Sequence, residues 1–430
     1  MTPERSLGDT PMGARRWVAI ALAVFLNGLD GYDAASISFA APGIAADWGL
    51  GPAVLGWVLS MELIGMAAGS LAFGMAADKY GRRPCILACL VLMAGGMFGA
   101  TYAENVEQLS AYRIVTGLGI GGMLASLTAV VAEYSNDRWR PVVISTMIVG
   151  YPIGTVLGGL VARQLVAAGD WRDVFLFGFA VTVAALPLAF ALLPESPVWL
   201  ARSRNHLTQA NAVLQRFRLP PASAREPTND FGRSGSLLEL FRHGLARTTV
   251  LLTLAYVGHM SCYYFIFKWL PKLVVDLGHP AQAGADMLIV AMLAGAAAGP
   301  VFGLLAGRIT LPRASILVLL GAALAVNLFA RVGADLMLLT IAAALVGIFF
   351  NSGGVAFYAL LANAFPAELR GRGIGFGVGV GRAGAALGPA MAGAMLAADF
   401  GLPSTALVMG MGPLLGAVII LVLFRPTRDR

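Results

Sequence analysis

Long apolar segments alternate with short polar ones along the whole chain. Each has about 20 residues or more, enough at ~1.5 Å per residue for an α-helix to cross the hydrocarbon core of a bilayer. The pattern predicts an all-α membrane protein with twelve transmembrane helices in two six-helix, pseudo-symmetric bundles. The expected segments are 16–42, 52–77, 84–103, 106–134, 140–165, 172–194, 247–277, 283–307, 312–331, 334–363, 370–397 and 403–424.

The composition agrees with this pattern, because 58% of the 430 residues are hydrophobic and only 12% are charged. A soluble protein of this length needs a more highly charged surface. The net charge is +7, but the basic residues lie in short loops rather than on one face, so no nucleic-acid partner is expected. The three cysteines lack metal-ligand spacing, and we expect no metal site and no cofactor.

Arginine and lysine are concentrated in alternate loops, which distinguishes the cytoplasmic loops of membrane proteins from the opposite ones. The chain ends, the loops after the even-numbered spans and the central polar stretch are rich in these residues. We therefore expect a multi-pass protein with both termini in the cytoplasm. The expected location is the bacterial inner membrane, with the lipid bilayer around a monomer.

Two motifs recur at a nearly constant distance. The stretch that begins at Gly74 has a counterpart at Gly303, and Gly154-Thr-Val-Leu-Gly158 has one at Gly384, so the shifts are 229 and 230 residues. A constant shift indicates a parallel duplication of six spans, and such repeats place a substrate site at mid-membrane between the halves. The expected parts are an N-terminal bundle over 1–194, a cytoplasmic linker over 195–246 and a C-terminal bundle over 247–430.

The linker itself carries one helical pattern. Leu207, Ala210, Val213, Leu214 and Phe217 follow helical spacing, with arginines nearby. This arrangement predicts a short amphipathic helix that lies on the inner membrane surface.

Two aspartates lie inside the first apolar segment. Asp30 and Asp33 are three residues apart on one helical face, and a carboxylate near the bilayer centre costs roughly 2.5–3.5 kcal/mol on insertion scales. This face should therefore meet an aqueous cavity, a cation or a passing solute. Helical rise places Arg113 of span 4 at an overlapping depth. The aspartates could carry protons, or they could form a permanent structural ion pair with Arg113.

A second intramembrane arginine, Arg382, lies near the middle of span 11 between glycines. Because a guanidinium presents a fork of donors that matches a carboxylate, Arg382 or Arg113 could hold the carboxylate of a substrate. The alternative is a pair between helices, for example with Glu62 of span 2.

Span 7 is rich in aromatic residues. Tyr263, Tyr264 and Phe267, together with Tyr358 of span 10, could stack on an aromatic ring. Such stripes also serve as packing or as interface belts. In the same two spans, His259 could join a proton path or be simply hydrogen-bonded, and Asn351 could be a flexing point or a hydrogen-bond contact.

The loop between spans 2 and 3 has the spacing Gly74-x-x-x-Asp78-Lys-Tyr-Gly81-Arg82-Arg83. Gly74 permits a close helix approach, Gly81 a tight turn, and Asp78 can face an arginine or a helix N-terminus. A plain basic loop is the alternative. The stretch resembles the loop 2–3 signature of the major facilitator superfamily, and the resemblance in spans, linker and duplicated halves covers essentially the whole chain. It implies that these residues act in gating.

A finer resemblance is to the aromatic acid:proton symporter family of that superfamily. It rests on Asp30-Gly-Tyr-Asp33, the span 4 stretch around Arg113, Pro194-Glu195-Ser196, and the span 11 stretch around Arg382. It implies a secondary active transporter that imports a hydroxybenzoate-like carboxylate with a proton by alternating access, driven by the proton gradient. The partners would be the small organic anion and protons.

Lys268 departs from that family, which commonly has a small or polar residue before Trp269-Leu-Pro271. It could be an extra anion contact, which would suit a dicarboxylate such as muconate, or a lysine that snorkels to the outer interface. A sugar or multidrug transporter of the same fold is a further alternative. No catalytic pattern indicates an enzyme.

Overall fold

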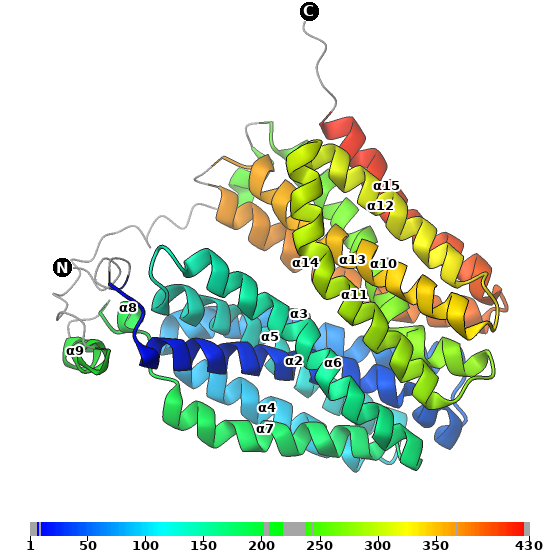
Figure 1. The fold of residues 1–430 in the computed structure, drawn as a ribbon, viewed down its shortest axis with the longest axis horizontal. Helices are drawn as coiled ribbons and strands as arrows, with labels where there is room; N and C mark the ends of the chain where they lie inside the picture. The colour runs from blue at the N-terminus through cyan, green and yellow to red at the C-terminus, as the bar shows by residue number, and fades with distance from the viewer. Residues whose placement is uncertain are drawn as a thin grey trace, which may run out of the picture. The chain divides into compact units, whose positions relative to one another are not determined.

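The computed structural model describes Leu7 and residues 10–201, 206–217, 237–242, 244–366 and 369–424. Within these residues the regular structure is helical (Figure 1). The helices that fill the first half are α2 (Ala14–Trp48), α3 (Pro52–Tyr80), α4 (Arg82–Thr101), α5 (Val106–Tyr134), α6 (Arg140–Ala168) and α7 (Arg172–Leu192). Short helices α8 (Pro197–Leu200), α9 (Leu207–Arg216) and η3 (Leu237–Phe241) follow. The second half contains α10 (Ala246–Asp276), α11 (Ala281–Arg308), α12 (Leu311–Phe329), α13 (Leu336–Ala364), α14 (Arg370–Ala397) and α15 (Gly401–Leu423).

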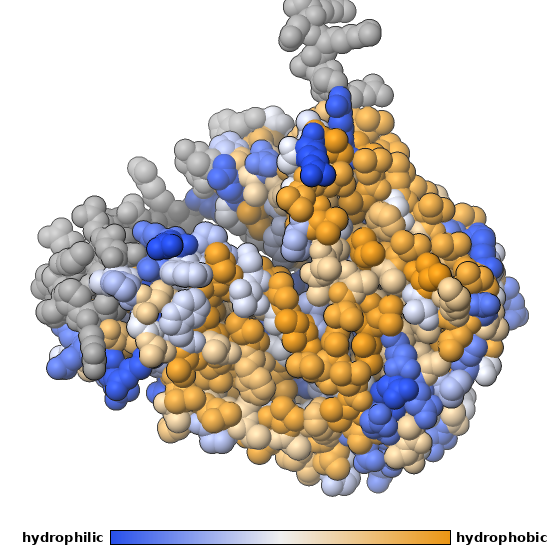
Figure 2. Space-filling model, viewed as in Figure 1, coloured by the Kyte–Doolittle hydropathy of each residue, from blue (hydrophilic) through white to orange (hydrophobic). Residues whose placement is uncertain are grey.

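The predicted all-α membrane class is confirmed, and each of the twelve expected segments coincides with a helix. Eleven helices of the described residues are long and apolar enough to cross a membrane. The exception is α14, which has 28 residues but alternates glycine with other residues and carries three arginines. Figure 2 shows apolar side chains over a large part of the face in view, and residues such as Leu71, Met75 and Leu304 are largely exposed. Such a surface suits lipid.

The chain forms two compact units. The first contains Met1–Ala34, Gly65–Thr155 and Phe175–Ser234, and the second contains Ala35–Ile64, Val156–Val174 and Gly235–Arg430. These two units are defined by contacts between residues in space. The division expected from the sequence repeat, with boundaries near 194 and 246, stays a prediction.

In the first unit, small residues bring α2 and α6 into backbone contact. A Cβ on Gly154 would overlap the carbonyl of Gly28, and a Cβ on Gly31 would overlap the carbonyl of Tyr151. The hydroxyl of Thr155 donates to the carbonyl of Gly31 at 2.8 Å. Glycines at this interface allow the helices to approach closely, as small residues do in membrane helix pairs.

The second unit repeats this arrangement between α10 and α14. Gly384 faces Val257, and a Cβ on Gly388 would overlap the carbonyl of Ser261. The hydroxyl of Ser261 donates to the carbonyl of Gly384 at 2.7 Å. The motif copies at Gly154 and Gly384 therefore have equivalent packing roles, which is expected of a duplication.

The predicted amphipathic helix is present as α9. Its buried face packs on protein, because Leu214 contacts Leu7 and Ala210 contacts Leu200 and Ala201. Part of the apolar face is therefore covered by protein, and the position of the helix on the inner membrane surface stays a prediction. Burial of these apolar side chains against the protein ties the helix to the first unit.

Candidate functional site

An aromatic cluster lies on α10 in the second unit. The ring of Tyr263 is 4.3 Å from that of Phe267 and 5.0 Å from that of Tyr264, in the latter case edge to face. Both tyrosines are half-buried, whereas Phe267 is buried. The structure thus brings together the three span 7 aromatics that the sequence singled out.

The cluster extends to a residue that the sequence reasoning missed, Tyr256. It lies seven residues before Tyr263 on α10, and this spacing of two helical turns is the signal that could have identified it. Its ring is buried against Gly381 of α14 and lies 6.4 Å from the ring of Tyr358 of α13, which is exposed. A Cβ at position 381 would overlap the ring, so glycine is needed there for the contact.

Arg382 follows Gly381 and is half-buried. The close packing of α10 on α14 puts its guanidinium near enough for its charge to act on the hydroxyls of Tyr256 and Tyr264. Among the residues that the structure describes, Arg382 has neither a hydrogen-bond partner nor an ion-pair partner. A half-buried cation without a partner, beside several phenol rings, is a place where an organic anion can bind.

The carboxylate that could have paired with Arg382 interacts with another cation. Glu62 of α3 accepts a hydrogen bond from the ammonium of Lys268 at 2.9 Å, and both side chains are almost fully buried in the second unit. The snorkelling alternative for Lys268 is therefore wrong, because its side chain is buried and its ammonium is paired inside the protein. Its charge is also compensated by Glu62.

His259 and Asn351 have local partners. The Nε2 of His259 lies 3.1 Å from the carbonyl oxygen of Phe350, whose ring stacks on the imidazole at 5.4 Å. The amide of Asn351 donates to the carbonyl of Gly347 at 2.9 Å, within α13. This geometry agrees with the simpler alternatives, a hydrogen-bonded histidine and a hydrogen-bonding asparagine.

Asp30 and Asp33 lie inside the first unit. Their side chains are 1% and 0% exposed, so the expectation of a water-filled cavity beside them is wrong in this conformation. Asp33 lies against Gly178 of α7, whose lack of a side chain leaves room for the carboxylate. The carboxylate of Asp30 has no hydrogen-bond partner among the described residues.

Arg113 lies next to Asp33, as the argument from helical depth predicted. Its guanidinium is fully buried, donates to the backbone carbonyl of Asp33 at 2.9 Å and lies over the ring of Phe175 at 5.4 Å. Because its donors are directed at the protein interior, Arg113 is a poorer candidate for a substrate contact than Arg382.

The loop between α3 and α4, for which the sequence predicts a role in gating, forms a network of polar contacts. Gly81 has φ 106°, a conformation that glycine adopts readily. Arg82 pairs with Asp78 at 2.8 Å and lies 3.6 Å from Glu133. The expectation that Asp78 meets an arginine is confirmed. The expectation of a close approach at Gly74 is not met here, because a Cβ at that position would contact nothing within 4 Å.

Glu195 completes this network, a role that the sequence reasoning did not assign. Its carboxylate accepts hydrogen bonds from the backbone N–H groups of Arg82 at 2.9 Å and Arg83 at 3.2 Å, at the N-terminus of α4. Burial raises the pKa of Glu195 above its ordinary value, although these N–H groups and that of Ser196 act in the opposite direction. The sequence signals were an acidic residue directly after an apolar span and its place in the Pro194-Glu195-Ser196 stretch.

The family model described as Major Facilitator Superfamily matches residues 20–326 and 279–430. The chain belongs to the major facilitator superfamily. This transporter is 30% identical over 421 residues to the gallate transporter of Pseudomonas putida, with 96% of this chain and 93% of that protein covered. It is also 30% identical over 393 residues to the 4-hydroxybenzoate transporter PcaK of Pseudomonas aeruginosa, with 88% and 86% covered.

Solved structures of this superfamily have the same fold. The inward open xylose transporter XylE of E. coli aligns with a TM-score of 0.74, over 96% of this chain and 98% of that one, at 18% sequence identity. At this identity the likeness concerns the fold alone. The protein is thus a multi-pass transporter of small organic molecules and not an enzyme, and its relatives at about 30% identity include aromatic acid transporters.

Proposed function

We propose that this transporter carries an aromatic monocarboxylate of the hydroxybenzoate type into the bacterial cell together with a proton. The observation that carries the proposal is the half-buried guanidinium of Arg382, which has no partner among the described residues and follows Gly381 at the ring of Tyr256. The relatives named as gallate and 4-hydroxybenzoate transporters support the same class of substrate. Inner-membrane location and cytoplasmic termini remain part of the proposal.

The cluster matches the parts of such a substrate. A guanidinium can donate two parallel hydrogen bonds to one carboxylate, tyrosine and phenylalanine rings can pack on an aromatic ring, and phenol hydroxyls can hydrogen-bond to ring hydroxyl groups. Lys268 does not add a second anion site in this state, because Glu62 compensates its charge. The charge balance therefore favours a monocarboxylate over a dicarboxylate, and a sugar would not need the arginine.

Asp30 is our candidate for the proton carrier. Burial of an ionised carboxylate without a hydrogen-bond donor is costly, so a site of this kind favours the protonated acid. Access of water in another conformation of the transport cycle would allow the proton to leave. Asp33, next to Arg113, is the candidate partner in this exchange.

The test is uptake of labelled 4-hydroxybenzoate into proteoliposomes that contain the purified protein, under an inward pH gradient. We expect uptake that a protonophore abolishes and that Asp30→Asn reduces strongly. Arg382→Gln should raise KM for the acid far more than for the corresponding amide. Uptake of a sugar or of muconate, but of no aromatic monocarboxylate, would overturn the proposal.

A further inference from the structure

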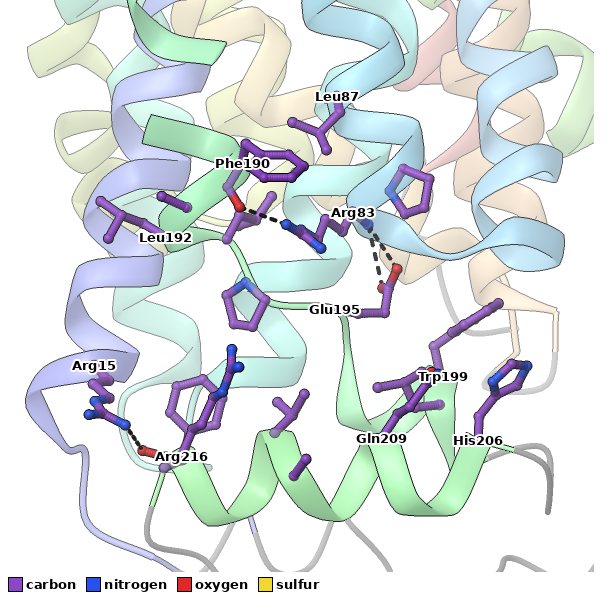
Figure 3. Close-up of a pocket in the computed structure, with 18 of the residues that line it drawn as sticks. Arg15, Arg83, Leu87, Phe190, Leu192, Glu195, Trp199, His206, Gln209 and Arg216 are labelled. Atoms are coloured by element: carbon purple, nitrogen blue, oxygen red, sulfur yellow. Dashed lines mark hydrogen bonds between the residues drawn. The ribbon is translucent and has the colours of Figure 1, made fainter. Parts of the chain in front are cut away.

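A groove of about 990 Å³ lies in the first unit, and no residue of the aromatic cluster lines it. We call it the linker groove. It is formed by the start of α2, the start of α4, the end of α7, the segment that leads to α8, and α9 (Figure 3). Neither the aspartates nor the residues assigned to the substrate line it.

One part of the linker groove is apolar and open. Phe190 and Leu192 at the end of α7 and Val18 of α2 line it, and their side chains are 65%, 46% and 45% exposed. Phe190 and Leu192 lie at the end of a helix that is long and apolar enough to span the membrane. The groove therefore adjoins surface that suits acyl chains.

The other part is basic. Arg15, Arg83 and Arg216 line it, together with His206. Arg83 donates to the carbonyl of Phe190 at 2.6 Å, and Arg15 donates to the carbonyl of Arg216 at 2.8 Å, as Figure 3 shows. Within the described part of the chain, none of these three guanidiniums forms an ion pair.

The one carboxylate in the lining can offset at most one of these three charges. Glu195 uses its oxygens to accept the N–H groups of Arg82, Arg83 and Ser196. The groove therefore combines several arginine side chains that have free donors with an apolar wall at the edge of a membrane-spanning helix. A free small anion would need only the first feature, whereas a phospholipid needs both.

We propose that the linker groove binds an anionic phospholipid. Its phosphate lies among Arg15, Arg83 and Arg216, and an acyl chain lies along Phe190 and Leu192. Basic pockets at membrane protein surfaces recognise anionic headgroups in this manner. The bound lipid would join α9 of the linker to α7 and α4, next to the network around Glu195.

The experiment uses the full-length protein in nanodiscs of phosphatidylcholine with a minor fraction of phosphatidylglycerol. Native mass spectrometry measures how much phosphatidylglycerol stays bound to the protein after the protein is released from the nanodisc. We expect retention by the wild type and a loss of about thirtyfold in R15Q/R216Q, from two cations worth about 1 kcal/mol each. A212E, which adds a negative charge on exposed α9 in the groove, should lower retention in the same direction.

The matched control is R138Q, which removes an exposed arginine from the loop between α5 and α6, outside the groove. It should retain the lipid as the wild type does, and thermal melts should show that all variants are folded. Equal retention in the wild type, R15Q/R216Q and A212E would overturn the proposal. Displacement of the lipid by millimolar inorganic phosphate would also overturn it, because the groove would then be a site for a free anion.

Discussion

Replacement of Lys268 by methionine would leave the buried carboxylate of Glu62 without its cation. The two charged atoms are 2.9 Å apart, and the side chains are 4% and 0% exposed. Removal of one partner from a buried ion pair costs about 3–5 kcal/mol, mostly because the remaining charge is left uncompensated. We expect Lys268→Met to destabilise the protein by about 4 kcal/mol.

That free energy can be converted to a melting shift. An unfolding entropy of about 2.1 cal/mol/K per residue, over 430 residues, is about 0.9 kcal/mol/K. The melting midpoint in detergent, measured at one heating rate, should therefore fall by roughly 4 °C in Lys268→Met. Lys272→Met is the control on the same helix, because its ion pair with Asp276 is more exposed and should contribute less than about 1 kcal/mol.

A double-mutant cycle isolates the pair. Glu62→Gln/Lys268→Met removes both charges of the pair, so we expect its midpoint to lie closer to the wild type than that of either single variant. If the losses of the two single variants simply add in the double variant, Glu62 and Lys268 do not interact and our account of the pair is refuted.

Three further predictions concern the site and the network around Gly81 and Glu195. Arg382→Ala should raise KM for 4-hydroxybenzoate at least about tenfold, because one charged hydrogen bond to the substrate is lost. An unchanged KM in uptake assays would show that Arg382 does not contact the substrate. Gly81→Ala should lower the free energy of unfolding by about 1–3 kcal/mol, because φ is 106° and the Glu195 carboxylate fills the Cβ position. Gly74→Ala is the control, because a Cβ at that position would meet open space. Equal melting shifts in the two variants would contradict this account. The pKa of Glu195 is raised in the folded state, so the folded protein binds this proton more tightly than the unfolded chain does. The protonated carboxyl therefore adds to the free energy of unfolding below its ordinary pKa of about 4.3. This contribution is lost as the pH rises through the raised pKa of the folded state. The melting difference between the wild type and Glu195→Gln should follow this dependence across pH 4–8, and a difference constant with pH would refute it.

The sequence by itself determined the helices and the turn at Gly81. An apolar segment long enough to span a bilayer has to satisfy its backbone internally, and a helix does so without help from distant residues. This is why the expected segment 106–134 coincides with α5 at both ends. The depth of Arg113 near Asp33 was predictable for the same reason, because helical rise is constant.

Only the tertiary structure decided which side chains meet. In a membrane protein, lipid-facing and protein-facing surfaces are both apolar, so hydrophobic periodicity does not identify the inner face of a helix. Glu62 could have faced Arg382, but the packing of α3 and α10 within the second unit brings it to Lys268. Burial of Asp30, the contact of Tyr256 with Gly381 and the attachment of Glu195 to α4 likewise depend on neighbours that are distant in sequence.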